Sequence, residues 1–113
     1  MTKQKRTVFY LSDRTGITAE TLGHSLLSQF DGIEWEIINV PFLDDLEKVQ
    51  AVLVQINHAT EYDGHRPLVF STLLKPEILE VIKRTNCRVF DFFETFINPI
   101  EQELNQPFAR MAG

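Results

Sequence analysis

The stretch TVFYLSDRTGITAETLGHSLLSQF, residues 7–30, predicts a strand followed at once by a helix. Residues 7–12 form a short apolar run rich in β-forming residues, which is typical of a strand buried on both faces. Thr18 is the expected N-cap of the helix. The apolar residues after it recur at helical spacing: Leu22, Leu26, Leu27 and Phe30. The polar residues 13–16 therefore form the connecting loop.

The alternation of strand and helix continues along the chain. Three further runs rich in β-forming residues predict strands at 34–40, 68–71 and 88–91, each followed by a helical pattern. Strand and helix thus alternate four times with short loops, which predicts an α/β fold: a three-layer, Rossmann-like domain around a four-stranded parallel sheet. We expect one domain over residues 1–113, strand order 2-1-3-4, and a topological switch point between the first and third strands.

The later helices have recognisable start signals. Asp44 and Glu47 form a variant of the capping box ahead of the second helix. Pro76 suits the first turn of the third helix, and Asn98 is the expected N-cap of a last helix that runs to about Leu104.

Composition and charge exclude several classes of protein. The net charge of −5 argues against a general nucleic-acid binder, which needs a basic face to neutralise phosphates. The only cysteine of the 113 residues is Cys87, so the chain has no internal disulfide framework and suits a reducing compartment. No apolar run approaches the roughly 18 residues of a membrane span, and the N-terminus has no secretory signal pattern. We therefore expect a cytoplasmic protein.

Polar residues cluster at the predicted carboxyl ends of three strands, where ligands bind in open parallel sheets. The candidates to face a phosphate or a substrate are Asp13, Arg14, Thr15, Gly16, Thr18, Ser71, Thr72 and Asp91. Backbone N–H groups at a helix start, two hydroxyls and a guanidinium together suit an oxyanion such as phosphate. The alternative interpretation is a plain strand-to-helix turn in which Asp13 and Thr15 cap the helix.

The sequence contains no established nucleotide or metal motif. Neither the P-loop pattern nor the dinucleotide-binding fingerprint occurs. His58 and His65 do not have the spacing of a metal pair, and the lone Cys87 cannot supply several thiolates, so we expect neither a metal nor a bound cofactor. Asp91 is open to two interpretations, binding of Mg²⁺ or orientation of a loop.

Two features indicate close packing against another surface. Gly23 lies inside the first predicted helix, where glycine costs about 1 kcal/mol relative to alanine. The helix is therefore expected to approach the sheet or a second chain closely. Four of the nine phenylalanines, Phe92, Phe93, Phe96 and Phe108, crowd the C-terminal part, and some are expected to face another domain or subunit.

Two segments, VFYLSDRTGITAETLGHSLLSQF (8–30) and RPLVFSTLLKPEI (66–78), closely resemble the start of a known family. It is the phosphoenolpyruvate synthase regulatory protein family, also called the pyruvate, phosphate dikinase regulatory proteins. The resemblance implies a bifunctional enzyme. As a serine/threonine kinase it uses ADP to phosphorylate a threonine of the synthase or dikinase, and as a phosphorylase it removes that phosphate with inorganic phosphate and releases pyrophosphate. The family usually has a small residue where Arg14 stands.

Family members are more than twice as long as this chain, and their nucleotide-binding P-loop lies in the C-terminal half. The resemblance therefore implies that residues 1–113 are an N-terminal domain that is inactive by itself. It implies phosphoenolpyruvate synthase or pyruvate, phosphate dikinase as the partner, and we expect a homo-oligomer. The alternative is a stand-alone flavodoxin-like or receiver-like module for binding or dimerisation. A receiver needs an acceptor aspartate at the end of the third strand, where this chain has Ser71 and Thr72.

Overall fold

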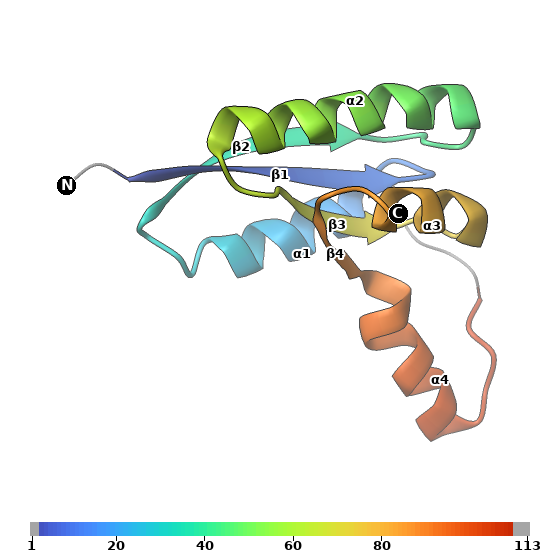
Figure 1. Ribbon diagram of the computed structural model, residues 1–113. Helices are drawn as coiled ribbons and strands as arrows, with labels where there is room; N and C mark the ends of the chain where they lie inside the picture. The colour runs from blue at the N-terminus through green and yellow to red at the C-terminus, as the bar shows by residue number, and fades with distance from the viewer. Residues whose placement is uncertain (1–2, 110–113) are drawn as a thin grey trace.

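The computed structural model describes residues 3–109, which form an α/β fold around one parallel sheet. The sheet has four strands in the order β2-β1-β3-β4, as predicted (Figure 1). The strands are β1 (Gln4–Ser12), β2 (Ile33–Val40), β3 (Leu68–Thr72) and β4 (Arg88–Asp91). β1 pairs with both β2 and β3, so the switch point lies between β1 and β3.

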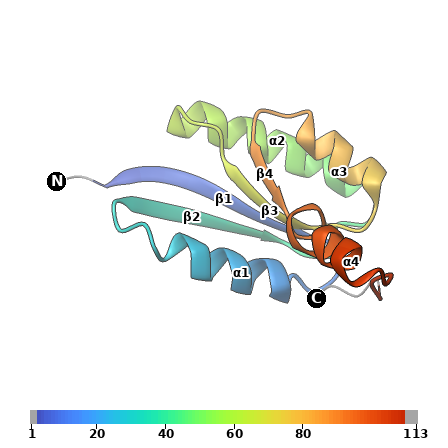
Figure 2. The ribbon, with the colours of Figure 1, turned by 90° about the horizontal axis from the view of Figure 1, so that it is seen from below.

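Helices cover both faces of the sheet, which gives the predicted three layers. α1 (Ile17–Leu27) lies on one face, and α2 (Leu46–Asp63) and α3 (Pro76–Lys83) lie on the other (Figure 2). After β4, a π-helix labelled η1 (Phe93–Ile97) continues directly into α4 (Asn98–Leu104). No helix within residues 3–109 is both long enough and apolar enough to cross a membrane.

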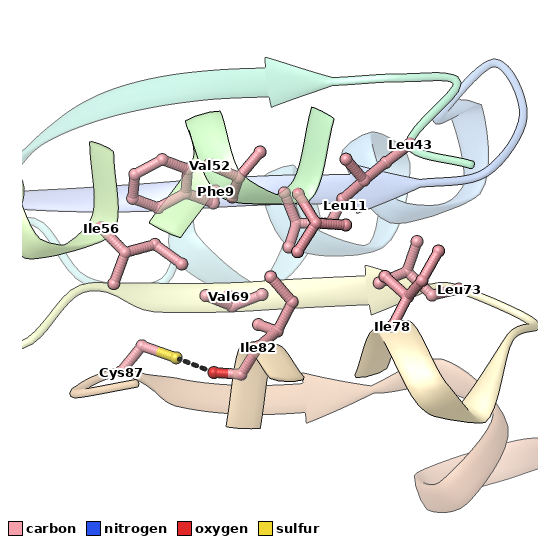
Figure 3. Close-up of a cluster of buried hydrophobic side chains, with 11 residues drawn as sticks. Phe9, Leu11, Leu43, Val52, Ile56, Val69, Leu73, Ile78, Ile82 and Cys87 are labelled. Atoms are coloured by element: carbon pink, nitrogen blue, oxygen red, sulfur yellow. Dashed lines mark hydrogen bonds between the residues drawn. The ribbon is translucent and has the colours of Figure 1, made fainter. Parts of the chain in front are cut away.

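The larger core lies between the sheet and the pair α2 and α3. Phe9 and Leu11 of β1 and Val69 of β3 meet Ile56 of α2 and Ile82 of α3, and all five are fully buried (Figure 3). The second core, on the α1 face, is smaller and is built from Val8, Tyr10, Ala19, Leu27 and Phe70. β1 supplies side chains to both cores because successive residues of a strand point to opposite faces.

Three predicted helix caps were wrong. α1 begins one residue before Thr18, and its N-cap is Gly16, whose left-handed backbone (φ 84°) places its carbonyl to accept from the N–H of Glu20. α2 is capped by Asp45 instead of Asp44, since the Asp45 carboxylate accepts from the N–H of Lys48 at 2.8 Å.

Asp44 and Asn98 have other places in the structure. The Asp44 carboxylate binds the ammonium group of Lys48 at 2.9 Å, which lowers the pKa of Asp44. Asn98 lies inside continuous helical backbone because η1 runs directly into α4, so the residue before α4, Ile97, is itself helical.

Gly23 marks the closest approach of α1 to the sheet. A Cβ atom at this position would lie 2.9 Å from Cζ and 3.0 Å from the hydroxyl oxygen of Tyr10. The Tyr10 ring is 2% exposed and packs at 6.0 Å from the ring of Phe70, so it has little room to move. The structure thus identifies the sheet as the surface that the helix approaches.

We predict that Gly23→Ala lowers the free energy of unfolding by about 1–3 kcal/mol, since overpacking a well-filled core costs that much. In a Tyr10→Leu background the same substitution should become neutral or stabilising by up to about 1 kcal/mol, because only the helix propensity of alanine is left. Urea unfolding of the four proteins measures both effects.

Gly32→Ala serves as the control, because no atom lies within 4 Å of a Cβ built at Gly32. A Gly23→Ala protein as stable as the wild type, in either background, would contradict the role assigned to Tyr10.

Candidate functional site

The carboxyl ends of β1 and β3 form the centre of the candidate site. Ser12, the last residue of β1, pairs in register with Thr72, the last residue of β3. Both residues are fully buried. The loop after β1 and the loop after β3 therefore leave the sheet side by side, at the switch point predicted from the sequence.

The loop after β1 is held in place by hydrogen bonds. The hydroxyl of Ser12 accepts from the N–H of Arg14 at 3.0 Å. The loop after β2 is bonded to it as well, since the N–H of Leu43 donates to the Ser12 carbonyl and the N–H of Phe42 to the Arg14 carbonyl, each at 2.8 Å. Phe42 adopts a left-handed backbone conformation (φ 56°) where it makes this contact. The backbone of the candidate loop is thus fixed before any ligand binds.

Asp13 connects the two sides of the switch point. Its carboxylate oxygen Oδ2 accepts from the N–H of Leu74 in the loop after β3 at 3.3 Å, and its Oδ1 is buried without a hydrogen-bond partner among residues 3–109. Asp13 therefore does not cap α1, and α1 has no side-chain cap. The carboxylate fixes the loop after β3 instead.

The side chains of Arg14, Thr15 and Thr18 do not join the two loops as the Asp13 carboxylate does. Arg14 and Thr15 are exposed, Thr18 is half-buried, and Gly16 is buried beside the Cβ of Ser12. Neither Arg14 nor Thr15 uses its side chain in a hydrogen bond to another residue of the described range, so both are free to meet a ligand.

Thr72 carries the polar atom that is hardest to explain by folding alone. Its hydroxyl is fully buried and has no hydrogen-bond partner within residues 3–109. Buried polar groups normally have partners, and each exception needs a reason such as a bound water or ligand. The neighbouring Ser71 is satisfied, because its hydroxyl accepts from the N–H of Leu73 at 3.2 Å.

Ser71 and Asp91 form a second group on the opposite face of the sheet. They pair in register across β3 and β4, and Ser71 pairs with Leu11 of the larger core. Ser12 and Thr72 lie one residue further along their strands and so point to the α1 face. The pleat therefore divides the candidates, since Ser71 and Asp91 lie on the face opposite to Thr72.

Asp91 orients the segment that follows β4. It is 3% exposed, and its Oδ2 accepts from the N–H of Glu94 at the start of η1 at 3.0 Å. Burial raises the pKa of the Asp91 carboxyl, and the Glu94 N–H and the Ser71 hydroxyl only partly offset this rise. Within residues 3–109 no three His, Cys, Asp or Glu side chains come together as a metal site. Of the two interpretations, the geometry favours orientation of the chain.

A hollow of about 450 Å³ lies elsewhere, between β2 and α2. Its lining residues include Thr7, Glu36, His58 and Tyr62, and none of the candidate residues contributes to it. The hydroxyl of Thr7 donates to the Asp63 carboxylate at 2.7 Å beside this hollow. The sequence analysis did not select these residues, because only the pairing of β2 at a sheet edge brings them together.

Cys87 belongs to the core and not to a site. Its thiol donates to the Ile82 carbonyl at 3.5 Å (Figure 3), and burial raises its pKa, which keeps the thiol protonated. Cys87 thus packs as a small buried apolar residue.

We predict that Asp91→Asn increases stability at neutral pH. The pKa of Asp91 is raised on folding, so ionising it costs more in the folded than in the unfolded state. The wild type should therefore lose stability relative to Asp91→Asn as the pH rises from 3.8, the ordinary pKa of an aspartate, through the raised pKa of Asp91. Below pH 3.8 the free energies of unfolding of the two proteins should converge. Urea unfolding between pH 3 and 7 measures the difference, with the exposed Asp31→Asn as the control for loss of a charge. Parallel pH profiles for wild type and Asp91→Asn would contradict the prediction.

Comparison with known proteins gives consistent matches over nearly the whole chain. The model of the kinase/pyrophosphorylase family matches residues 8–113. A relative from Nitrosomonas europaea is 59% identical over 109 residues, which are 96% of this chain and 40% of the relative. Relatives from Marinobacter nauticus and Alkalilimnicola ehrlichii are each 50% identical, and they cover 96% and 100% of this chain and 40% and 41% of their own lengths.

All three relatives bear the name phosphoenolpyruvate synthase regulatory protein. The chain spans about two fifths of their length. The family match includes residues 8–12 of β1, the loop of residues 13–16 and β3, which build the switch point. The chain belongs to the kinase/pyrophosphorylase family.

Proposed function

We propose that this chain is the N-terminal domain of a bifunctional enzyme that regulates phosphoenolpyruvate synthase or pyruvate, phosphate dikinase. The enzyme phosphorylates a threonine of its target with ADP, and it removes the phosphate with inorganic phosphate. The family match, the name of the relatives and the two fifths of their length that the chain spans support this proposal. The proposal also agrees with the resemblance, which implies a P-loop in the C-terminal half of the family's members, since residues 1–113 have no P-loop pattern.

The observation that carries the proposal is the group of polar residues held in fixed positions at the carboxyl ends of β1 and β3, at the switch point. A loop fixed by the Ser12 hydroxyl presents the free side chains of Arg14 and Thr15, and the buried Thr72 hydroxyl lies at the adjacent strand end without a partner. Phosphoryl transfer depends on positioning and charge stabilisation, which such a preformed edge supplies. Asp13, Gly16 and Thr18 belong to the loop and helix start that present this group. Ser71 and Asp91 lie at the same ends of the strands but on the opposite face of the sheet.

Two further properties belong to the proposal. A cytoplasmic location agrees with the single, buried Cys87. A homo-oligomer is supported by the exposed apolar side chains of Val54 and Tyr62, which stand beside the open edge of β2.

We predict that residues 1–113 alone do not phosphorylate the target, because phosphoryl transfer needs a preorganised cradle for the nucleotide and its metal ion. A protein of the relatives' full length that carries this segment should phosphorylate it. The measurement is mass spectrometry of threonine phosphorylation in phosphoenolpyruvate synthase and in pyruvate, phosphate dikinase after incubation with ADP. Threonine phosphorylation by residues 1–113, or none by the full-length protein on either target, would overturn the respective part of the proposal.

We predict that the loop binds phosphate or pyrophosphate weakly, in the millimolar range. Arg14→Ala should weaken binding by about ten- to a hundredfold, the value of a charge-assisted hydrogen bond of roughly 1.5–3 kcal/mol. Asp13→Asn should strengthen binding, since it removes a repelling charge and keeps an acceptor for the Leu74 N–H. Both effects should shrink with added salt, because the site is exposed.

Titration by calorimetry or NMR checks these effects. Arg84→Ala is the matched control, because Arg84 is exposed at the C-terminal end of α3, beside the amino end of the sheet. If wild type, Arg14→Ala and Asp13→Asn bind equally, the loop does not hold the anion.

A further inference from the structure

The two faces of the sheet are covered unequally. Two helices, α2 and α3, cover one face, whereas α1 alone packs against β1 and β3 on the other (Figure 2). Side chains of the outer strands on the α1 face therefore stay accessible, and Phe90 of β4 is 37% exposed. Phe90 is not isolated, since Leu26 and Phe96 beside it are also exposed, and a contiguous apolar patch of this kind marks an interaction site.

An apolar groove lies between α1 and the β4 edge on this face. We call it the phenylalanine groove, and its apolar lining consists of Leu22, Leu26, Phe70, Phe90, Phe92 and Phe96. It encloses a hollow of about 60 Å³. The groove is narrow, so it suits single apolar side chains entering from a packed segment.

The walls of the phenylalanine groove are preformed. The rings of Phe70 and Phe90 stack with their centroids 5.5 Å apart, and those of Phe92 and Phe96 are 6.0 Å apart. The guanidinium of Arg88 lies over the face of the Phe90 ring, 4.8 Å from its centre, and helps to hold it in place. A groove whose rings are already ordered loses little side-chain entropy when a partner binds.

The segment after β4 borders the groove and is itself incompletely packed. α4 has no buried residue, and its Ile100 and Leu104 are 52% and 63% exposed. Figure 1 shows α4 projecting from the sheet. Beyond α4 the chain returns to η1, where the rings of Phe108 and Phe93 lie 5.4 Å apart. Phe108 is therefore held against η1, and two other residues of η1, Thr95 and Phe96, line the groove.

We propose that the phenylalanine groove is the docking site for the part of the longer polypeptide that the relatives have and this chain does not. That part amounts to about three fifths of their length, since the chain spans 40% of them. A segment of the same polypeptide has a high effective concentration at a groove beside its own point of attachment. The proposal rests on the family relationship and not on the phosphoryl chemistry.

Thiol labelling tests the proposal in a protein of the relatives' full length that carries this segment. Leu26→Cys and Phe96→Cys place a thiol at positions that are 43% and 42% exposed here. Ala51→Cys is the control on the exposed side of α2, away from the groove. Maleimide modification of each peptide is followed by mass spectrometry, and each rate is divided by the rate of the same variant in urea.

We expect Leu26→Cys and Phe96→Cys to react at least tenfold more slowly than Ala51→Cys, with no change over a hundredfold dilution. Equal rates at all three positions would show an open groove and overturn the proposal. Slow labelling that becomes fast on dilution would identify a second copy as the occupant and would overturn it as well. Both results are independent of kinase or phosphorylase activity, so they do not depend on the proposed function.

Discussion

The burial of β1 on both faces and both edges is the constraint on which the other elements depend. Residues 7–12 are at most 3% exposed, and β1 pairs with β2 on one side and β3 on the other. The three helices that cover the sheet each pack against a surface to which β1 contributes: α2 and α3 over Phe9 and Leu11, and α1 over Tyr10. The loop that follows Ser12 consequently leaves from the centre of the sheet, between the ends of β2 and β3. The position of the candidate site is thus a direct result of the central strand.

The same position explains why polar groups accumulate there at a cost to stability. Asp13, Thr72 and Asp91 each bury an oxygen that has no partner within residues 3–109. Leaving such a group unpaired costs on the order of 1–3 kcal/mol, and hydrophobic replacements would remove that cost. All three lie at or directly after the carboxyl ends of β1, β3 and β4, where the proposed function places the phosphate site. The apolar cores on the two faces of the sheet offset this cost.

The sequence was sufficient for the strands, because four runs rich in β-forming residues alternate with helical patterns and the helices between them require parallel pairing. The expected strand order was confirmed as well. The helix starts were less predictable. Asp44 and Asp45 are both good caps, and only the approach of the chain from β2 decides between them. η1 could not be predicted, since no residue pattern distinguishes a π-helix from the first turns of an α-helix such as that expected at Asn98.

The structure places the candidate residues at the carboxyl ends of β1, β3 and β4 or directly after β1, as expected, but their grouping required the structure. Ser71 and Thr72 of β3 point to opposite faces of the sheet, so their two hydroxyl groups lie in different surroundings. The contact of Asp13 with the Leu74 N–H joins residues 61 positions apart, and no local signal predicts it. Local pattern thus predicts which strand end a residue occupies, whereas the pleat and the loop contacts decide what it touches.

The unequal covering of the two faces separates folding from association. The face under α2 and α3 holds the larger core, with fully buried residues from all of these elements and from β1 and β3. The α1 face depends on one helix held close to the sheet by Gly23, and Phe90 beside it is left accessible. A second full helix over β4 would close the phenylalanine groove and leave the α1 face complete. Because the domain is stabilised mainly from one side, the other side can keep ordered aromatic rings exposed without losing the fold, which is the arrangement that docking of another segment requires.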